Sequence, residues 1–253
     1  MHRFYLPPDQ CRDSSLCLTG REAHHAIHVL RHRVGQRVTI LDGAGHELLC
    51  EITALPRDTV HLEVLERTFV PALPCQITLL QALPKGKLIE SLIEKATELG
   101  VARIVPLLTD RVTAQLDAAD GMRKTGKWRA VAIEAIKQCG AAWLPVVDPP
   151  TTLVEFLARK ERPDLALVGA LQGNRRHPRE CLREFEAKQW CRPRTVWIWI
   201  GPEGDFTPEE SNAIQSAGAQ PVSLGRLVLR TETAAIYCLS FLNYELHLGA
   251  GDA

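Results

Sequence analysis

The sequence of 253 residues lacks any long hydrophobic run, and no stretch reaches the ~20 apolar residues that a membrane-spanning helix needs. Residues 1–8 contain no apolar segment of the kind found in secretory signals. Hydrophobic residues make up 45% and charged residues 24% of the chain, which is typical of globular proteins with a buried core. These features predict a cytoplasmic protein with no membrane association.

Paired cysteines are missing as well. The eight cysteines are scattered at Cys11, Cys17, Cys50, Cys75, Cys139, Cys181, Cys191 and Cys238. No two form a C-x-x-C pair, and the chain is not a short secreted one, so we expect reduced thiols rather than a zinc site or a disulfide scaffold. His24, His28 and His32 recur at helical spacing, but no thiolate or carboxylate completes a ligand set. We therefore expect no bound metal.

The chain also lacks an excess of positive charge, because 30 Lys and Arg residues balance 30 Asp and Glu residues. Proteins that bind nucleic acid contact its phosphates with Lys and Arg, so such a function here requires local basic clusters. The candidate residues are Arg31, Arg33, Arg37, Lys85 and Lys87. Solvent-exposed charge is the more common explanation of any single cluster. Two nucleotide-binding signatures, the P-loop and the G-x-G-x-x-G fingerprint, are absent.

Short alternating segments separated by turns predict a small β-barrel domain over residues 1–70. The expected strands cover 37–41, 47–55 and 59–66. Thr19 and Glu22 match a capping box for a helix that ends near residue 30. Pro71 and Pro74 then predict a stiff linker to a second domain.

From residue 75 to residue 253 the pattern changes to alternating strands and helices. The expected strands cover 77–83, 103–108, 165–171, 195–200 and 221–224, and the expected helices cover 86–99, 123–139, 208–218 and 233–248. Thr207 and Glu210 match a second capping box, with Pro208 at the first helical position. This alternation predicts an α/β domain whose parallel sheet carries helices on both faces.

Three segments of the second domain run from the end of an apolar strand into a turn of small residues, at 167–173, 197–206 and 224–234. Ligands of parallel sheets bind outside the carboxyl ends of the strands, so these three loops are expected to form one pocket. Gly201 and Gly204 would allow the backbone to approach a flat ligand closely. On spacing alone, a tight turn before a helix is the simpler explanation of this Gly-Pro-Glu-Gly sequence.

Two of these segments carry a specific pattern. Residues 200–206 read Ile-Gly-Pro-Glu-Gly-Asp-Phe, and residues 224–234 read Leu-Gly-Arg-Leu-Val-Leu-Arg-Thr-Glu-Thr-Ala. Together with Lys-Ala-Thr-Glu-Leu-Gly-Val at 95–101 and His-Val-Leu-Arg at 28–31, followed by Gly35, they resemble the bacterial 16S ribosomal RNA (uracil-N3)-methyltransferases of the SPOUT class. The resemblance extends from about residue 3 to residue 248.

This resemblance implies a PUA-like barrel followed by an α/β domain with a trefoil knot. It also implies S-adenosylmethionine as cofactor, 16S ribosomal RNA or the small ribosomal subunit as substrate, and a homodimer with its site near the subunit interface. The cofactor residues that it implies are Leu171, Gly173, Gly201, Pro202, Glu203, Gly204, Leu224, Gly225, Leu229, Arg230 and Thr231. The five residues of the basic clusters would contact RNA. Two positions depart from the family pattern: Asp205 stands where a glycine is usual, and Ala141 follows Gly140 where an arginine is usual.

Methylation of uracil N3 requires loss of the imino proton, so a nearby cation would stabilise the anionic ring. We predict Arg230 in this role, and an ion pair with Glu232 or Glu203 is an equally good structural explanation of that arginine. Glu232 is a candidate base, a ligand for the methionine ammonium group, or a charge that favours a helix N-terminus. Three alternatives remain open: methylation of transfer RNA or another ribosomal position, a non-catalytic ribosome-assembly factor, and an unrelated α/β protein that binds ATP or NAD.

Overall fold

The computed structural model describes residues 1–86, 88–112 and 117–247. The chain divides into two compact units. The first unit contains residues 1–72 and 133–144, and the second contains residues 73–132 and the chain from residue 145 onward. The sequence did not indicate that residues 133–144 pack with the first unit.

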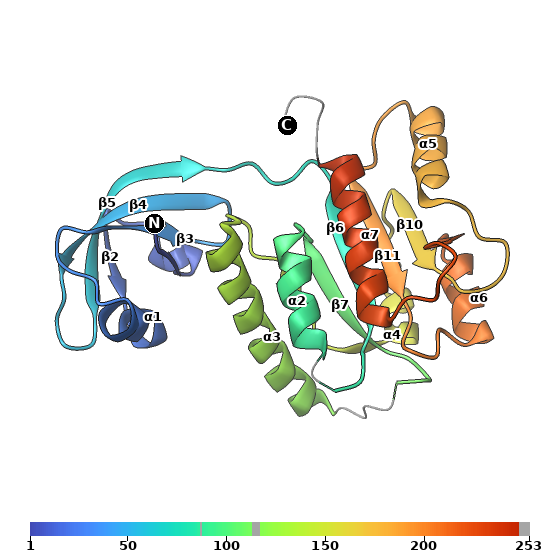
Figure 1. Ribbon diagram of the computed structural model, residues 1–253, viewed down its shortest axis with the longest axis horizontal. Helices are drawn as coiled ribbons and strands as arrows, with labels where there is room; N and C mark the ends of the chain where they lie inside the picture. Colours follow the sequence, from blue (N-terminus) through green and yellow to red (C-terminus); the bar gives the residue numbers. More distant parts are fainter. Residues whose placement is uncertain (87, 113–116, 248–253) are drawn as a thin grey trace. The chain divides into compact units, whose positions relative to one another are not determined.

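The first unit is built on a five-stranded sheet that curls on itself in Figure 1. Its strands are β1 (Arg3–Tyr5), β2 (Ser15–Leu18), β3 (Arg37–Leu41), β4 (His46–Ala54) and β5 (Val60–Phe69), in the order β1-β3-β4-β5-β2. All neighbours are antiparallel except the parallel pair β1 and β3. Within residues 1–72 the unit also has three short helical segments: a 3-10 turn at Pro8–Gln10, α1 (Gly20–His24) and a π-helical turn at His25–Val29. This is the expected small β domain.

The predicted capping box at the start of α1 is wrong. Thr19 is the N-cap residue, but its side chain accepts no hydrogen bond from the helix. Glu22 instead accepts hydrogen bonds from the backbone N–H of Tyr5 at 3.4 Å and from Lys137 Nζ at 2.8 Å. Because Lys137 is buried, its ammonium group needs a charged partner, and that requirement takes Glu22 away from the helix end.

The second unit is built on a parallel sheet with the strand order β12-β10-β11-β6-β7-β8, and β9 also pairs with β7. Its strands are β6 (Gln76–Ala82), β7 (Arg103–Leu108), β8 (Val146–Val147), β9 (Thr151–Thr152), β10 (Leu165–Gly169), β11 (Thr195–Ile200) and β12 (Gln220–Val222). Its helices are α2 (Leu88–Glu98), α4 (Leu153–Ala158), α5 (Pro178–Gln189), α6 (Pro208–Ser216) and α7 (Thr231–Leu246), and α3 (Ala118–Cys139) contributes its first part. The expected α/β class is confirmed.

Helices cover both faces of this sheet, as the sequence pattern predicted. Figure 1 shows α2 and α7 side by side on one face. On the other face, Trp197 and Trp199 of β11 pack on Phe156 of α4. Their ring centroids lie 5.2 and 5.4 Å from the ring centroid of Phe156. Truncation of either tryptophan to alanine would cost about 3–5 kcal/mol of folding free energy, because it would leave a cavity in a closely packed core.

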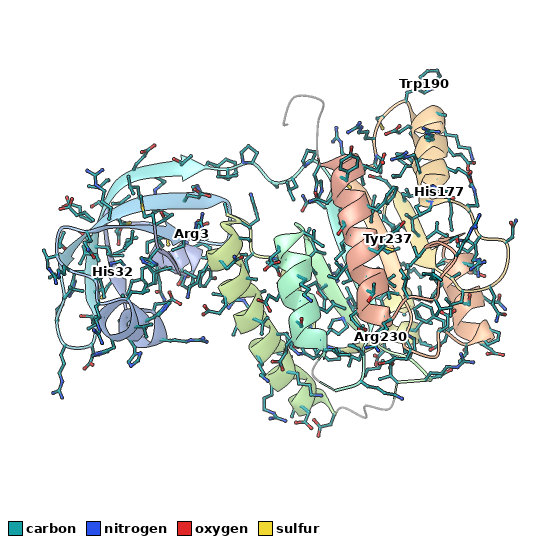
Figure 2. All side chains as sticks on the ribbon, viewed as in Figure 1. Arg3, His32, His177, Trp190, Arg230 and Tyr237 are labelled. Atoms are coloured by element: carbon teal, nitrogen blue, oxygen red, sulfur yellow. The ribbon has the colours of Figure 1, made fainter. Side chains whose placement is uncertain are left out.

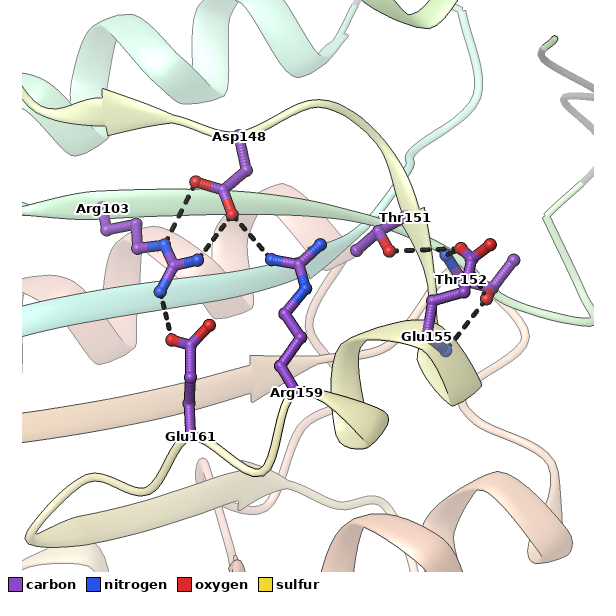
Figure 3. Close-up of polar contacts among 7 residues, drawn as sticks. All are labelled: Arg103, Asp148, Thr151, Thr152, Glu155, Arg159 and Glu161. Atoms are coloured by element: carbon purple, nitrogen blue, oxygen red, sulfur yellow. Dashed lines mark hydrogen bonds and ion pairs between the residues drawn. The ribbon is translucent and has the colours of Figure 1, made fainter. Parts of the chain in front are cut away.

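Helix α6 begins at the predicted capping box. The Thr207 side chain accepts a hydrogen bond from Glu210 N at 3.2 Å, and Glu210 Oε2 accepts one from Thr207 N at 2.9 Å. A second box of this kind, between Thr152 and Glu155, begins α4 (Figure 3). The sequence pattern did not predict α4, because a helix of 6 residues is too short to show a hydrophobic period.

A network of ion pairs fastens the segment around α4 to the sheet (Figure 3). Arg103 contacts Asp148 through Nε at 3.1 Å and through Nη2 at 2.7 Å, and its Nη1 lies 2.6 Å from Glu161 Oε2. Arg159 also contacts Asp148, at 3.1 Å. Because Arg103 is the first residue of β7, this network lies at the amino end of that strand. We assign it to the fold.

The eight cysteines are all unpaired, as expected. Burial raises the pKa of Cys50 and that of Cys75 to about 12, so neither thiol ionises at neutral pH.

Of the helices within the described ranges, none is both long and apolar enough to cross a membrane. The imidazole rings of His24 and His28 lie 4.8 Å apart, and His32 packs against His2 and Phe4 instead.

The end of α7 holds a buried histidine in its neutral form. His247 Nε2 lies 2.8 Å from the carbonyl oxygen of Cys75, which can only accept, so this nitrogen carries the proton. Asn243 Nδ2 lies 3.2 Å from His247 Nδ1 and also donates to the carbonyl oxygen of Leu99 at 3.0 Å. Burial lowers the pKa of His247 below its ordinary value of 6.5.

We expect the free energy of unfolding to decrease as the pH falls below 6.5. Below this pH His247 is protonated in the unfolded chain but stays neutral in the folded chain. The decrease in the free energy of unfolding is complete once the pH has fallen below the lowered pKa of the folded state. Urea denaturation at a series of pH values measures this dependence. His247→Gln keeps a donor for Cys75 and should flatten the curve in this range. An equally steep decrease in the variant would contradict the assignment.

Candidate active site

A cavity of about 770 Å³ lies at the carboxyl ends of β10, β11 and β12. Three loops form it, and they are the three that the sequence predicted. The residues lining it are Gly169, Ala170, Leu171, Arg175, Ile200, Gly201, Pro202, Glu203, Asp205, Ser223, Leu224, Gly225, Arg226, Leu227, Val228, Leu229, Arg230, Thr231 and Ala234. Its position follows the general rule that parallel sheets bind ligands outside the carboxyl ends of their strands.

Gly201 begins the central loop, where the chain is too crowded for a side chain. A Cβ atom on this residue would lie 3.0 Å from Asp205 Oδ1 and 3.1 Å from the backbone nitrogen of Phe206. Gly169, at the end of β10, is similarly tight, because its Cβ would meet Ile200 and Leu224 at 3.3 Å. Glycine at these two positions allows the loops to pack this closely against each other, and both residues line the cavity.

Asp205 connects two of the three loops. It adopts a left-handed conformation with φ of 63°, which aspartate tolerates better than most residues. Its Oδ1 accepts a hydrogen bond from Phe206 N at 2.8 Å, and its Oδ2 accepts one from Leu171 N at 3.4 Å. Asp205 does not cap the following helix, because Thr207 occupies the N-cap position. The carboxylate instead stabilises the turn and the neighbouring loop.

A buried chain of hydrogen bonds joins β6, the start of α7 and the central loop. Gln81 is fully buried, and its Nε2 donates to Thr231 Oγ1 at 2.9 Å and to the carbonyl oxygen of Ala82 at 2.8 Å. Thr231 Oγ1 in turn donates to the carbonyl oxygen of Gly201 at 2.7 Å. The hydroxyl of Thr231 therefore fixes the central loop relative to helix α7 and the sheet. Sequence reasoning missed Gln81, because it reads as an ordinary strand residue.

Arg230 lies at the N-terminus of α7, at the cavity, and its position is labelled in Figure 2. Its side chain is exposed, and within the described ranges no carboxylate lies at ion-pair distance from it. The pairing with Glu232 or Glu203 that would have explained this arginine structurally does not occur. Glu232 is half-buried in the first turn of α7, where its charge favours the helix N-terminus.

The structure brings most of the predicted cofactor residues together. Those that line the cavity are Leu171, Gly201, Pro202, Glu203, Leu224, Gly225, Leu229, Arg230 and Thr231. Gly173, Gly204 and Glu232 lie outside its lining. Arg175 and Arg226 also line the cavity and were not among the predicted cofactor residues, although both lie in or just after the recognised loops. Arg175 Nη1 donates to the carbonyl oxygen of Leu171 at 2.6 Å and holds that loop closed.

The predicted RNA-contacting residues fall in both units. Arg31, Arg33 and Arg37 are exposed in the first unit, where Arg31 adopts a φ of 53°. Lys85 is exposed in the second unit, in the loop after β6. Lys87 lies outside the described residues.

Comparison with known proteins agrees with this architecture. Residues 71–243 match the model of the RNA methyltransferase domain, and residues 18–65 match that of the RNA methyltransferase PUA domain. Ribosomal RNA small subunit methyltransferase E of Bacillus subtilis is 30% identical, with 100% of each chain covered. The protein of the same name from Synechocystis is 32% identical, with 96% of this chain and 77% of the relative covered.

Two similar solved structures carry a ligand. A methyltransferase of Legionella pneumophila in complex with S-adenosylmethionine has a TM-score of 0.85 and 32% identity, with 96% of this chain and 97% of that chain covered. Ribosomal RNA small subunit methyltransferase E of Neisseria gonorrhoeae, bound to S-adenosylmethionine, has a TM-score of 0.80 and 27% identity, with 97% and 98% covered.

A PUA-type β unit, followed by a parallel-sheet unit with a cavity built from three loops, defines an RNA methyltransferase of two domains. Relatives that match over nearly the whole chain make the assignment more specific. The chain belongs to the ribosomal RNA small subunit methyltransferase E family. The resemblance inferred from the motifs is therefore confirmed, and the trefoil knot stays a prediction.

The hydroxyl of Thr231 is expected to contribute to stability. Thr231→Val should lower the free energy of unfolding by about 1–3 kcal/mol, because the carbonyl oxygen of Gly201 loses its buried donor. Thr231→Ser retains the hydroxyl and is the matched control. Urea denaturation of the three proteins measures the difference. If the valine variant is as stable as the serine variant, the hydroxyl does not anchor the loop.

Proposed function

We propose that this protein transfers a methyl group from S-adenosylmethionine to N3 of a uridine in 16S ribosomal RNA, acting in the cytoplasm on the small ribosomal subunit. The observation that carries the proposal is the cavity of about 770 Å³, which the three motif-bearing loops form in a chain of this family. The Legionella and Neisseria structures, both with S-adenosylmethionine bound, support the choice of cofactor.

The cavity fits this cofactor in size and in chemistry. Its volume lies within the range of about 300–1,000 Å³ typical of small-molecule sites. Gly169 and Gly201 line the cavity, and we assign their backbone amide groups to recognition of the adenine edge. Leu171, Leu224 and Leu229 supply apolar contacts along the walls. We assign Pro202, Glu203, Gly225, Arg230 and Thr231 of the lining to the same site, with Gly173 and Gly204 in the adjoining turns.

When bound, S-adenosylmethionine supplies an electrophilic methyl group. The uracil ring must lose its N3 proton to accept that group, which leaves negative charge on N3 and the flanking oxygens. Arg230 stabilises this charge, because its exposed guanidinium lies at the cavity and at the N-terminus of α7, where the helix dipole also favours an anion. We assign Glu232, in the first turn of α7, the role of accepting the N3 proton.

Alignment of the two reactants is the second requirement for catalysis. The central loop can position its ligand only if it is itself rigid. Thr231 provides that rigidity, because its hydroxyl accepts a hydrogen bond from Gln81 and donates one to Gly201. Asp205 connects the same loop to Leu171. No covalent nucleophile is needed in this mechanism.

The RNA contacts that we propose involve both units. Arg31, Arg33 and Arg37 are exposed on the PUA-type unit, and Lys85 is exposed in the loop after β6. These cations would pair with backbone phosphates, so RNA binding should weaken as the salt concentration rises.

A different RNA target is the second candidate function. It is favoured by Ala141, which occupies a position where the family pattern has an arginine and which packs beside Tyr5 and Ile136 rather than offering a charge. The chemistry and the cofactor would be the same, and only the identity of the substrate would change.

Transfer of labelled methyl groups to unmodified small ribosomal subunits, followed by nucleoside analysis, tests the proposal. We expect 3-methyluridine as the product. Transfer to transfer RNA alone would favour the second candidate function. Binding of S-adenosylmethionine without transfer to any RNA would indicate a non-catalytic assembly factor, and binding of ATP or NAD in its place would contradict the family-based choice of cofactor.

Arg230→Ala should lower kcat by about 10²–10³-fold, because the developing anion loses its charged partner. Calorimetry should show that the variant still binds S-adenosylmethionine. Arg226→Ala removes a cation from the same cavity, at a position earlier in the same loop; it is the matched control and should retain most of the activity. Near wild-type turnover by the Arg230 variant would contradict the catalytic role.

We also propose that the protein forms a homodimer through the outer face of α7. Tyr237 and Tyr244 lie seven residues apart on this helix, and they are 51% and 65% exposed. Leu227 and Val228, in a loop that lines the cavity, are 80% and 76% exposed. A second copy that covers these apolar side chains would also complete the wall of the active site.

Replacement of both tyrosines by glutamate should shift the protein from dimer to monomer in sedimentation experiments, because two buried charges would destabilise the interface. Trp190→Ser is the control, since this tryptophan is 92% exposed at the end of α5, away from α7 (Figure 2). A monomeric wild-type protein, or a dimer that persists in the variant, would exclude this interface.

A further inference from the structure

A second, smaller cavity of about 90 Å³ lies at the carboxyl ends of β6 and β7, next to the active-site cavity. Its lining comes from the loops after these strands, from α2 and from the first part of α3. The residues are Leu83, Pro84, Lys85, Gly86, Ile89, Arg111, Val112, Lys124, Trp128 and Glu203. The proposed function uses Lys85 as an RNA contact and Glu203 in the cofactor site, and it assigns no role to the rest of this lining.

Positive charge is concentrated at this cavity. Lys85, Arg111 and Lys124 all line it, and Glu203 is the one acidic residue of the lining. None of the ion pairs found within residues 1–86, 88–112 and 117–247 involves these three cations. Three cations against one carboxylate leave the lining with an excess of positive charge, which attracts an anion. The site is therefore suited to an anionic group from outside the protein.

The cavity is physically connected to the active site. Glu203 lines both cavities, and its Oε1 accepts a hydrogen bond from the backbone N–H of Lys85 at 3.1 Å. Arg111 donates a hydrogen bond to the carbonyl oxygen of Gly204. A Cβ atom on Gly204 would lie 3.2 Å from Arg111 Cδ, so glycine at this position allows the arginine to approach the central loop. An anion held here would lie beside the proposed cofactor.

The size and the floor of the cavity restrict the kind of anion. Its volume is far below that of the neighbouring cavity, so it accommodates a small group rather than a second nucleoside. Leu83, Ile89 and Trp128 are buried and form an apolar floor. A tetrahedral phosphate can contact the lysines and the arginine at the rim without placing polar groups against that floor. RNA supplies one such phosphate per nucleotide, whereas S-adenosylmethionine has none.

We propose that this cavity binds the backbone phosphate of a nucleotide adjacent to the target uridine. The inference rests on the proposed function, because it takes the methylated substrate to be RNA. Lys85, Arg111 and Lys124 hold the phosphate, and the bond from Arg111 to Gly204 couples its position to the central loop of the active site. The contact fixes the register of the strand, so that one uridine enters the larger cavity.

The variants Lys85→Gln and Lys124→Gln, and the double variant, test this inference in the full-length protein. Lys188→Gln is the matched control, because this lysine is exposed on α5 and lies away from both cavities. Methyl transfer to unmodified small ribosomal subunits gives kcat and KM, and calorimetry gives the Kd for S-adenosylmethionine. We expect the double variant to raise KM roughly ten-fold, since two charge-assisted contacts are lost. The Kd for the cofactor should stay unchanged.

Binding of a short single-stranded RNA that contains one uridine, measured by fluorescence anisotropy, gives a readout that does not depend on activity. Each lysine replaced should reduce the slope of log affinity against log salt concentration by about one. A methylphosphonate in place of the flanking phosphate should weaken binding by the wild-type protein and have little further effect on the double variant.

Unchanged KM and salt slope in both lysine variants would overturn the inference while leaving the proposed function intact. A higher Kd for S-adenosylmethionine in these variants would also overturn it, because the cavity would then serve the cofactor. Failure of the proposed function is a separate result, since the wild-type protein itself would then transfer no methyl group to ribosomal subunits. Retained sensitivity of the double variant to the methylphosphonate would place the phosphate elsewhere.

Discussion

The hydroxyl of Thr231 is the contact on which the arrangement of the active site depends. It accepts from Gln81 and donates to Gly201, so one buried oxygen joins a central strand, the first turn of α7 and the loop that forms the inner surface of the cavity. A buried polar group of this kind is costly unless all its neighbours are in place. The loop consequently has one favoured position, and Arg230, the preceding residue, is held at the cavity by the same constraint.

Parallel strand order explains why two cavities of different character lie side by side. The active-site cavity lies above β12, β10 and β11, and the basic cavity lies above β6 and β7, which continue the same sheet. Every one of these strands points its carboxyl end toward the same edge, so their loops meet there. Glu203, in the loop after β11, is the residue at which the two cavities join.

The sequence allowed the class of fold and much of the site to be predicted, because both depend on local patterns. Apolar runs that end in glycine-containing turns indicated β10, β11 and their loops, and Thr207 with Glu210 indicated the start of α6. The very short strand β8 carries no periodic signal and was missed. Gln81 and the role of Glu22 depend on partners far away in the sequence, Thr231 and Lys137, and no single-sequence pattern reveals such a pairing.

Asp205 has a consequence for the unfolded chain as well as for the folded one. It occupies a left-handed backbone conformation at a position where the family pattern has glycine. A residue with a side chain samples fewer conformations than glycine when the chain is disordered, which favours folding by about 0.4–1 kcal/mol. A left-handed conformation costs an L-residue roughly 1–2 kcal/mol, and aspartate tolerates it better than most residues, so the two effects largely cancel. Its two hydrogen bonds keep that conformation in place. The loop is thus ordered before a ligand arrives, and binding requires less loss of conformational freedom.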